Sequence, residues 1–471
     1  MRHGETRHAA YHLAQTKPLY SAASGLVPGQ VLFLALLFGA IIFGLVMNFS
    51  LMLQILRLCL LGLFGFIIAF RGLLLVVHFW PKPKPDMAQT TPKSWPLYTI
   101  LLPVYREARI LPKLVEAIAN LNYPRARLDI KLLLEADDEE TLRAARRLHL
   151  DANWEVLIVP NIGPRTKPKA LNVGLHRARG SLVTIYDAED RPHPDQLQAA
   201  VCAFAKDEDD LACVQAPLGY YNASQNWLTQ QFSLEYNAQF RVVLPALVRL
   251  GLAFPLGGTS NHFRKIALDE CGGWDPYNVT EDADLGFRLA AYGWRSGMIL
   301  PPTLEEATAG LLPWIGQRSR WIKGFVQTLF VHLRGTTPGG RPKHAFGFFA
   351  SLGVAVVSSF SHGLLLLATM VCLVCWPLGG QPPAVPDAIL AACGTLLAWG
   401  LLACGHIAAK DRTSWHIDPV LIISSLAYWP LQTWAALLAI KDLLVRPFHW
   451  EKTAHGHSFA HSHLLEEHQP P

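Results

Sequence analysis

Five long apolar stretches bracket a central polar block in this chain. They lie at about residues 30–48, 52–79, 345–378, 387–409 and 418–445. Each is long enough for a helix that crosses about 30 Å of hydrocarbon, which takes roughly 20 apolar residues. The pattern therefore predicts a transmembrane hairpin over residues 30–80 and a C-terminal transmembrane region over residues 345–446.

The charges between these stretches indicate how the chain is oriented. Basic residues occur in segment 1–29 and again at Lys82. Lys and Arg are enriched in cytoplasmic loops, so the N-terminal segment and the polar block are expected in the cytoplasm. Lys410 and Lys441 also look cytoplasmic, which conflicts with a single span between them. Either the last stretch bends back near Pro430 or the third stretch holds two short segments, which leaves five or six spans.

Two arginines, Arg57 and Arg71, interrupt the second apolar stretch. Cationic side chains within spans commonly reach toward the interface or take part in helix packing. The alternative for this pair is a role in lining the path of a polymer through the membrane.

The polar block changes to short apolar runs that alternate with helical patterns. The predicted strands are Thr99–Val104, Ile130–Leu134, Val156–Val159 and Leu182–Ile185. Strands that alternate with helices indicate an α/β domain with a mostly parallel sheet. Ligands bind such sheets at the carboxyl ends of the strands. Polar candidates follow three of these strands: Tyr105 and Glu107, Asp137 and Asp138, Asp187 and Glu189.

Composition agrees with a polar domain carried on membrane helices. Apolar residues make up 51% of the 471 residues and charged residues 16%, with a mean hydropathy of +0.22. The net charge of +5 includes no long basic run, which argues against a nucleic-acid partner. None of the eight cysteines belongs to a metal-ligand quartet in the sequence.

Three motifs follow one another along the polar block: Asp187-Ala188-Glu189-Asp190, then Thr280-Glu281-Asp282, then Gln317-Arg318-Ser319-Arg320-Trp321. Acidic pairs followed by a Q-x-x-R-W box beside membrane spans resemble the membrane-bound family 2 glycosyltransferases, such as cellulose and hyaluronan synthases. The resemblance covers roughly residues 97–335. It implies a Rossmann-like α/β catalytic domain of the GT-A fold over residues 95–335, which includes an interfacial helix.

The resemblance also implies the residues that bind a nucleotide-sugar donor. They are Tyr105, Glu107, Asp137, Lys169, Asp187, Gln317 and Arg320. Asp138 competes with Asp137, and it is also placed to cap the following helix. Lys167 is second to Lys169 for the diphosphate, at a helix N-terminus that favours anions on physical grounds.

Asp187 and Glu189 replace the family's usual D-x-D and are the expected metal ligands. Two carboxylates two residues apart can hold Mg²⁺ or Mn²⁺ against phosphate oxygens. The longer Glu189 departs from the family pattern, and Asp190 is the alternative ligand. A solvated turn is the alternative for the whole cluster.

The resemblance makes Asp282 the general base, with Glu281 and Asp284 as local competitors. Acids at a helix N-terminus also stabilise the helix, so capping is the alternative. Gly258 and Trp321 are expected at the acceptor site. Trp314 is expected to anchor the chain at the membrane interface.

The C-terminal tail, residues 447–471, holds a W-x-x-T that loosely resembles the family's gating loop, with Trp450 and Thr453 as its gating residues. Its several histidines are more typical of a polar terminus than of a metal site.

The sequence thus predicts inverting transfer from a nucleotide sugar, UDP-linked by analogy, to a growing β-linked polysaccharide that is exported through the membrane. A single transfer to a lipid acceptor is the alternative, and the intact acidic motifs argue against a degenerate transporter or scaffold. The expected location is a bacterial inner membrane with a cytoplasmic catalytic domain. The expected partners are a nucleotide sugar, a glycan or lipid acceptor, membrane lipid and export subunits.

Overall fold

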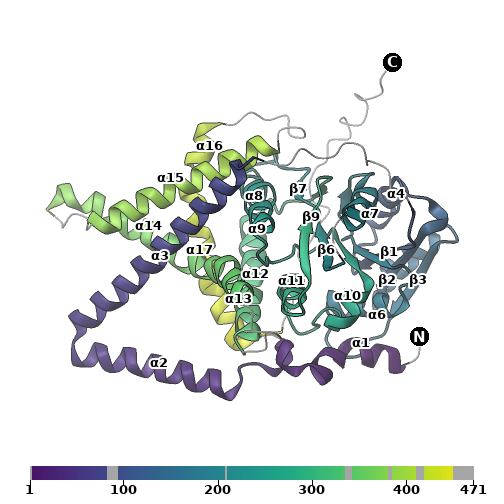
Figure 1. Ribbon diagram of the computed structural model, residues 1–471, viewed down its shortest axis with the longest axis horizontal. Helices are drawn as coiled ribbons and strands as arrows, with labels where there is room; N and C mark the ends of the chain where they lie inside the picture. Colours follow the sequence, from purple (N-terminus) through teal and green to yellow (C-terminus); the bar gives the residue numbers. More distant parts are fainter. Residues whose placement is uncertain are drawn as a thin grey trace.

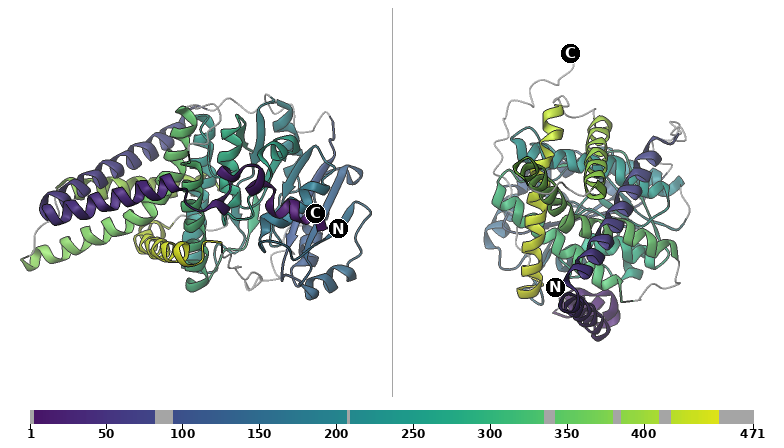
Figure 2. Two further views of the ribbon diagram at one scale, coloured as in Figure 1. Left: turned by 90° about the horizontal axis from the view of Figure 1, so that it is seen from below. Right: turned by 90° about the vertical axis from the view of Figure 1, so that its left-hand side faces the viewer.

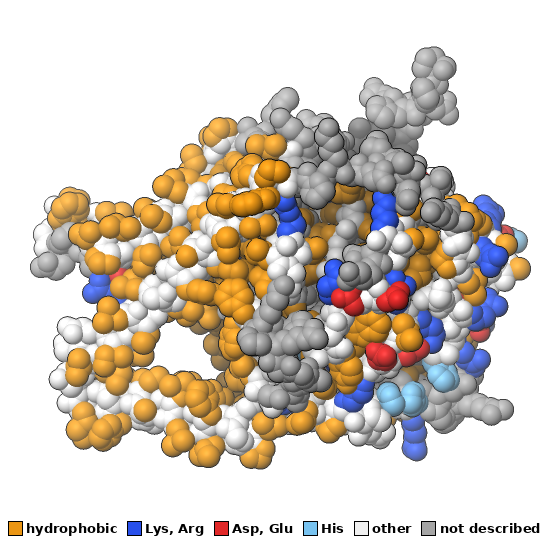
Figure 3. Space-filling model, in the orientation of Figure 1, with side chains coloured by type: hydrophobic (Ala, Val, Ile, Leu, Met, Phe, Trp, Pro, Cys, Tyr) orange, Lys and Arg blue, Asp and Glu red, His pale blue; other side chains and the backbone are white. Residues whose placement is uncertain are grey.

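The computed structural model describes residues 3–81, 94–206, 209–334, 342–379, 385–409 and 418–448. An α/β domain forms one end of the molecule, and long helices project from it at the other (Figure 1). Hydrophobic side chains cover the projecting helices, whereas Lys, Arg, Asp and Glu side chains gather over the α/β domain (Figure 3).

A seven-stranded sheet forms the centre of the α/β domain, in the order β3-β2-β1-β4-β8-β6-β9. Its strands are β1 (Tyr98–Val104), β2 (Leu128–Glu135), β3 (Trp154–Val159), β4 (Leu182–Ile185), β6 (Leu211–Gln215), β8 (Asn261–Arg264) and β9 (Arg295–Met298). Strands β1 to β4 are parallel, and β8 is antiparallel to both of its neighbours. The predicted mostly parallel sheet is therefore confirmed.

A second sheet has the order β5-β10-β7. Its short strands are β5 (Arg191–Pro192), β7 (Leu218–Tyr220) and β10 (Thr303–Glu305). Strand β5 starts just after the Asp187–Asp190 motif, and β10 ends at Glu305. This small sheet therefore connects the first acidic motif to a second acidic segment that the sequence analysis did not single out.

Helices cover both faces of the large sheet. They are α4 (Leu111–Ala119), α5 (Glu139–Arg147), α6 (Lys167–Arg177), α7 (Gln196–Lys206), α10 (Lys265–Cys271) and α11 (Glu281–Ala291). Leu101 and Leu133 pack into one core with α6, whereas Ile100 and Leu132 pack into the other with α4 and α7. Burial on both faces explains why these strands are almost continuously apolar.

Four further helical segments of the described chain lie between the domain and the membrane-type helices. They are α8 (Trp227–Ala238), the π-helical turn η4 (Gln239–Val243), α9 (Leu244–Arg249) and α12 (Leu311–His332). The C-terminal helices are α13 (Pro342–Phe348), α14 (Val354–Cys375), α15 (Val385–Ala408), α16 (Pro419–Ile423) and α17 (Ser425–Val445).

Five helical segments in the described part of the chain are long and apolar enough to cross a membrane: Pro28–Met47, Phe49–Phe79, Ala345–Leu378, Val385–Ala408 and Pro419–Val445. The first two, α2 and α3, follow each other directly in the chain, and Asn48 caps the start of α3 by accepting the Leu51 N–H at 3.0 Å. Helix α2 has no buried residue and diverges from α3 after their shared turn (Figure 1), although Gln30 near its start donates to the Phe330 carbonyl of α12 at 2.7 Å.

The last apolar segment, Pro419–Val445, keeps both of its ends against helices that adjoin the α/β domain, α8 at its start and α12 at its end. Near its start, the Leu421 carbonyl accepts a bond from Gln231 at 2.6 Å; just beyond its end, the Pro447 carbonyl accepts one from Gln327 at 2.8 Å. Figure 2 (left) shows α17 nearly end-on while α2 and α3 run across the view. Helix α17 thus lies alongside α12 rather than projecting with the others.

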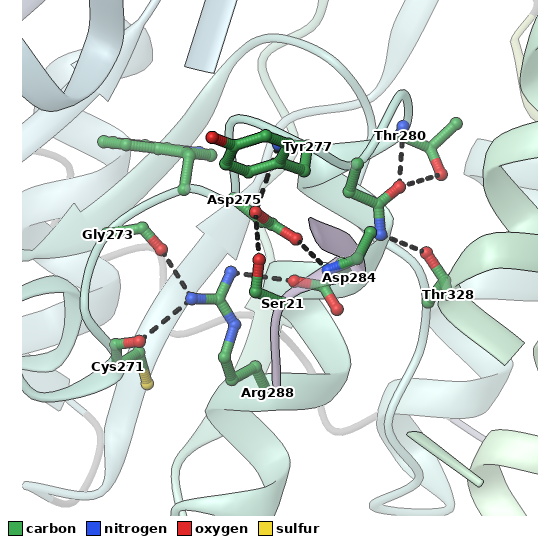
Figure 4. Close-up of polar contacts among 12 residues, drawn as sticks. Ser21, Cys271, Gly273, Asp275, Tyr277, Thr280, Asp284, Arg288 and Thr328 are labelled. Atoms are coloured by element: carbon green, nitrogen blue, oxygen red, sulfur yellow. Dashed lines mark hydrogen bonds and ion pairs between the residues drawn. The ribbon is translucent and has the colours of Figure 1, made fainter. Parts of the chain in front are cut away.

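Residues before the first apolar helix pack onto the α/β domain, which the sequence analysis did not foresee. Helix α1 (His3–Thr16) lies on α6, where Asn172 Nδ2 donates to the Ala9 carbonyl at 3.1 Å. Further on, Ser21 Oγ and Ala22 N–H donate to Asp275 at 3.0 and 2.6 Å (Figure 4). We call residues 3–25 the N-terminal strap.

Candidate active site

One continuous cavity of about 530 Å³ links the carboxyl ends of the sheet strands to the projecting helices. From the domain it is lined by Tyr105, Glu107, Lys167, Asp187, Glu189, Gly258, Glu281, Asp282, Glu305, Glu306, Gln317, Arg320 and Trp321. From α3, α14, α15 and α17 it is lined by Phe70, Arg71, Leu74, Val354, His362, Leu401, Leu402, Tyr428 and Gln432. Three separate sequence motifs therefore meet around one space.

Lys167, in the first turn of α6, joins the strand-end acids to the glycine segment. Its Nζ lies 2.6 Å from Asp187 Oδ1 and donates to the Gly258 carbonyl at 2.6 Å. Burial opposes its charge, but the carboxylates of Asp187, Asp282 and Glu281 raise the pKa of Lys167. The lysine is therefore a fixed positive charge beside the acids.

Asp282 lies in the first turn of α11, where the helix N-terminus favours a carboxylate. It is 6% exposed, and its Oδ1 is buried without a hydrogen-bond partner among the described residues. Burial, the charge of Glu281 and the charge of Asp187 raise its pKa well above the ordinary value for Asp, while Lys167 opposes the rise. A buried carboxyl whose pKa moves toward neutrality suits general-base chemistry.

Close packing fixes the start of α11. A Cβ on Gly324 of α12 would lie 2.4 Å from the Thr280 side chain, so only glycine lets α12 approach this closely. A Cβ on Gly258 would lie 3.8 Å from Asp282 Oδ2, which places the glycine segment directly against that carboxyl.

Asp284, the alternative to Asp282 as general base in the sequence analysis, has a structural role. It is fully buried, bonds Arg288 at 2.8 Å and His332 at 3.0 Å, and takes part in the network drawn in Figure 4. Burial raises its pKa, but Arg288 and His332 outweigh burial and lower it. Asp284 is therefore a buried anion within the core, two residues beyond Asp282 on α11 and not among the described residues that line the cavity.

Glu305 is an acid that the sequence analysis missed. It ends β10 and faces the cavity with Glu306. Burial and the charges of Glu189 and Asp187 raise its pKa well above the ordinary value. The signal available in the sequence was Glu305-Glu306 directly after a short apolar run, but two adjacent glutamates are common on surfaces.

Asp190 closes the first acidic motif rather than facing the cavity. It accepts the Asp187 N–H at 2.7 Å and bonds the Thr259 hydroxyl, and it is 1% exposed. Burial and the charges of Glu305, Asp187 and Glu189 raise its pKa. The turn thereby directs Asp187 and Glu189 into the cavity.

The donor set around Asp187 and Glu189 offers the carboxylate oxygens that a hard divalent cation prefers, but Lys167 Nζ already contacts both Asp187 oxygens, at 2.6 and 2.8 Å. The carboxylates of this set outnumber the neighbouring cations, and Asp282 Oδ1 has no hydrogen-bond partner among the described residues. Within the described part of the chain, no three His, Cys, Asp or Glu side chains converge as a complete metal site. A cation held by Asp187 and Glu189 would therefore need further oxygen ligands from a bound diphosphate.

Only some of the residues expected to bind the donor line the cavity. Tyr105 and Glu107 line the cavity after β1. Asp137 is not among the described residues that line the cavity, but it forms an ion pair at 2.8 Å with Arg165, which does line it. Its competitor Asp138 caps α5 by accepting the Thr141 N–H at 3.2 Å, as the capping alternative expects.

The two lysines of α6 exchange their expected order. Lys169 is fully buried and bonds Glu135 at 3.1 Å and the Pro160 carbonyl at 3.3 Å, so its charge is used inside the domain. Lys167 reaches the cavity instead. The geometry therefore favours Lys167 over Lys169 for a diphosphate, because a helical residue two positions away points to a different side of the helix.

Helix α12 presents Gln317, Arg320 and Trp321 to the cavity. Burial lowers the pKa of Arg320, and the charges of Glu281 and Asp187 oppose this. Trp321 packs near Tyr236 with ring centroids 6.2 Å apart, and the Arg318 guanidinium lies 4.9 Å from the Trp321 ring centre. Trp314, expected as an interfacial anchor, is instead fully buried, because α17 covers it with Tyr428.

A polar cluster missed by the sequence analysis joins α8, α12 and α17. Glu235 bonds Arg318 with both carboxylate oxygens and accepts bonds from Tyr428 at 2.8 Å and Gln432 at 3.2 Å. These residues are far apart in the sequence, so no local motif could indicate their contact. The predicted gating residues Trp450 and Thr453 lie outside the described residues.

Comparisons with known proteins agree with this geometry. Residues 96–324 match the family model described as "Glycosyltransferase like family 2". The chain is 28% identical over 242 residues to a β-monoglucosyldiacylglycerol synthase of Nostoc sp., covering 50% of each chain. It is 25% identical over 258 residues to a probable glucomannan 4-β-mannosyltransferase of Arabidopsis thaliana, covering 53% of this chain and 46% of that one.

The chain thus aligns with about half the length of these curated relatives. A mannosyltransferase from Pyrobaculum calidifontis, solved with GDP-Man and Mn²⁺, shares the fold with a TM-score of 0.53 and 21% identity. That likeness covers 82% of this chain and 99% of the other. The strand order, the converging motifs and the family match lead to one conclusion: the chain carries a family 2 glycosyltransferase domain of the GT-A fold, flanked by membrane-type helices.

Proposed function

We propose that this protein transfers a hexosyl group from a nucleotide sugar to a hydroxyl group of an acceptor held at the membrane. The supporting observation is the single cavity that runs from Asp187 and Asp282 to the membrane-type helices. Such a cavity lets a soluble donor and a membrane-held acceptor meet without releasing the acceptor into water.

In this proposal Asp282 is the general base. Its carboxylate takes the proton of the acceptor hydroxyl while the oxygen attacks the anomeric carbon and the bond to the diphosphate breaks. Attack opposite the leaving group inverts the configuration at that carbon. Lys167 and Arg320, which flank the acids, stabilise the negative charge that develops on the departing nucleoside diphosphate. Glu281 supports the base by raising the pKa of Asp282.

The remaining donor contacts come from the other lining residues. Tyr105 and Glu107 are proposed beside the base of the nucleotide, and Gln317 beside the diphosphate. Asp187 and Glu189 would hold Mg²⁺ or Mn²⁺, which would neutralise the diphosphate. We propose that Gly258 and Trp321 contact the acceptor. Gly258 lies directly against Asp282, and Trp321 packs near the ring of Tyr236.

We propose a membrane lipid as the acceptor class. The lining residues contributed by α3 and α15 are largely apolar, which suits acyl chains better than the hydroxyl-rich surface of a sugar polymer. The second candidate is the exported β-linked polysaccharide predicted from the sequence. It is favoured by the aromatic rings of Tyr236, Trp321 and Trp429 in the same cavity, because sugars stack on aromatic faces.

Product analysis tests both candidates. Protein reconstituted in vesicles receives radiolabelled UDP-glucose or GDP-mannose with Mg²⁺ or Mn²⁺, and the products are separated by size and by solvent extraction. A labelled lipid carrying one sugar is the expected product, and a polymer inside the vesicles would establish the second candidate. Asp282→Asn is expected to lose about 10²- to 10⁴-fold in turnover. A variant that binds donor but turns over normally would remove Asp282 from the mechanism.

The remaining parts of this function are proposals from the sequence. We propose a bacterial inner membrane with the catalytic domain in the cytoplasm, and a lid formed by Trp450 and Thr453. Chelation is expected to stop transfer and added Mg²⁺ or Mn²⁺ to restore it. Full turnover in chelator would exclude the divalent cation.

A further inference from the structure

The two arginines of α3 lie in different surroundings. Arg57 forms an ion pair with Asp387 of α15 at 2.8 Å, and its side chain is 48% exposed. This matches the helix-packing role expected for a cationic residue in a span. Arg71, nearer the catalytic end of the same helix, lines the cavity instead.

Arg71 lacks a bonded counter-ion within the described ranges of the chain. No hydrogen bond or ion pair to it occurs there, and the carboxylate that acts on it electrostatically is Glu235. Glu235, however, already holds the guanidinium of Arg318 with both oxygens and also accepts from Tyr428 and Gln432. The positive charge of Arg71 therefore has no bonded carboxylate among the described residues on the membrane side of the cavity.

The other neighbours do not remove this charge. His362 lies within electrostatic reach of Arg71, and its ring packs against Trp429 with centroids 4.8 Å apart. A histidine can only add positive charge. The acids of the catalytic end are matched in part by Lys167 and Arg320, which lie among them. An arginine left unpaired at membrane depth is unfavourable unless it faces a ligand or a water-filled cavity.

The walls of the cavity are apolar in part. Phe70 and Leu74 flank Arg71 on α3, and Leu247, Val354, Leu401 and Leu402 line the same cavity, together with hydroxyl and amide side chains such as Ser358, Ser359 and Gln432. A ligand that satisfies both the walls and the guanidinium carries an anionic head and apolar tails. A phosphate group is the best match for the head, because the planar fork of arginine donates two parallel bonds to phosphate oxygens.

We propose that Arg71 binds the phosphate group of an anionic membrane lipid, and that this lipid is the sugar acceptor. The second part rests on the proposed function; the first does not. A lipid held in this way places its phosphate at Arg71 and directs a headgroup hydroxyl along the cavity toward Asp282. Arg71 is then a specificity-determining residue that selects anionic over zwitterionic lipids.

Lipid binding tests the site directly. Full-length protein, delipidated in neutral detergent, is titrated with dioctanoyl phosphatidylglycerol or dioctanoyl phosphatidylcholine. Wild type is expected to prefer the anionic lipid, and Arg71→Gln is expected to weaken its binding by about 10- to 100-fold. Arg71→Lys should retain part of the preference. Arg57→Gln, which removes a charge from the same helix outside the cavity, is the matched control and should bind as wild type does.

Two results would overturn the site. One is unchanged phosphatidylglycerol binding in a folded Arg71→Gln protein. The other is displacement of the lipid by inorganic phosphate alone, which would mean that the site takes free phosphate rather than a lipid headgroup.

A transfer assay with labelled donor separates this inference from the proposed function. Arg71→Gln should raise the KM for phosphatidylglycerol and leave the KM for donor unchanged. A raised donor KM with unchanged lipid binding would assign Arg71 to the nucleotide instead. If wild type binds the lipid through Arg71 but glycosylates no acceptor, the lipid site stands and the proposed function fails.

Discussion

Glu281 and Asp282 are adjacent acids in the first turn of α11, and the negative charge of Glu281 acts on the pKa of Asp282. Asp282 must be ionised to act as a base, and burial together with the charge of Glu281 raises its pKa. The acidic limb of kcat/KM is therefore expected above pH 4, near which an ordinary Asp titrates.

Glu281→Gln removes a neighbouring negative charge, so the pKa of Asp282 falls and the limb moves to lower pH. The measurement is a pH profile of both proteins, with Asp269→Asn, an exposed acid, as control. Complete loss of turnover in Glu281→Gln would instead make Glu281 the base.

The two lysines of α6 provide a second test at the same scale. Lys167→Met removes a positive charge from the cavity, so donor affinity should fall by about tenfold or more. Lys169→Met leaves Glu135 buried without its partner, so it should lower the melting temperature and change donor affinity less. Calorimetric titration with nucleoside diphosphate and thermal melting measure the two effects. The reverse pattern would restore Lys169 as the diphosphate ligand.

Between elements, the N-terminal strap is held to the loop before α11 by Asp275. Asp275 is fully buried and accepts bonds from Ser21 and Ala22 as well as from the Tyr277 N–H. Burial and the charge of Asp284 raise its pKa to about 6. Asp275→Ala leaves these donors unpaired and should lower the free energy of unfolding by about 1–3 kcal/mol.

Thermal melting in detergent measures this change, with Asp269→Ala as the exposed control. Loosening of the strap should also lower turnover, because the same loop leads to Thr280 and Asp282. An unchanged melting temperature would show that the strap is not held through Asp275.

Some of these features could be predicted from the sequence and others could not. The alternation of short apolar runs with helical patterns predicts the mostly parallel sheet, and short motifs such as Thr280-Glu281-Asp282 indicate the acids, because both depend on local chain geometry. Lys167 and Lys169 could not be ranked, since a two-residue offset on a helix is decided by packing. Glu235 and Arg318 meet only because α8 and α12 pack together, and the docking of α1 on α6 depends likewise on contacts far apart in the sequence.

For the whole molecule, the course of α17 predicts the membrane topology. Gln231 of α8 bonds Leu421 near the start of Pro419–Val445, and Gln327 of α12 bonds Pro447 just beyond its end, although the segment is long and apolar enough to cross. We therefore expect four crossing helices, α2, α3, α14 and α15, with α17 lying at the interface beside α12. Single cysteines introduced at Asp418 and Phe448 in a protein whose native cysteines are replaced should react with membrane-impermeant reagents from the catalytic side. Labelling of the two positions from opposite sides would make α17 a fifth span.

The N-terminal strap also has a consequence for the biosynthesis of this protein. Ser21 and Asp275 are 254 positions apart, so Ser21 leaves the ribosome roughly 10 to 50 seconds before its partner. During that interval the hairpin of α2 and α3 enters the bilayer. If both helices insert, the strap and the catalytic domain end up in the same compartment and can join. If only one inserts, the bilayer separates them, and the domain stays incomplete and open to proteases. The catalytic domain is therefore expected to complete its fold only in chains whose α2 and α3 have both inserted.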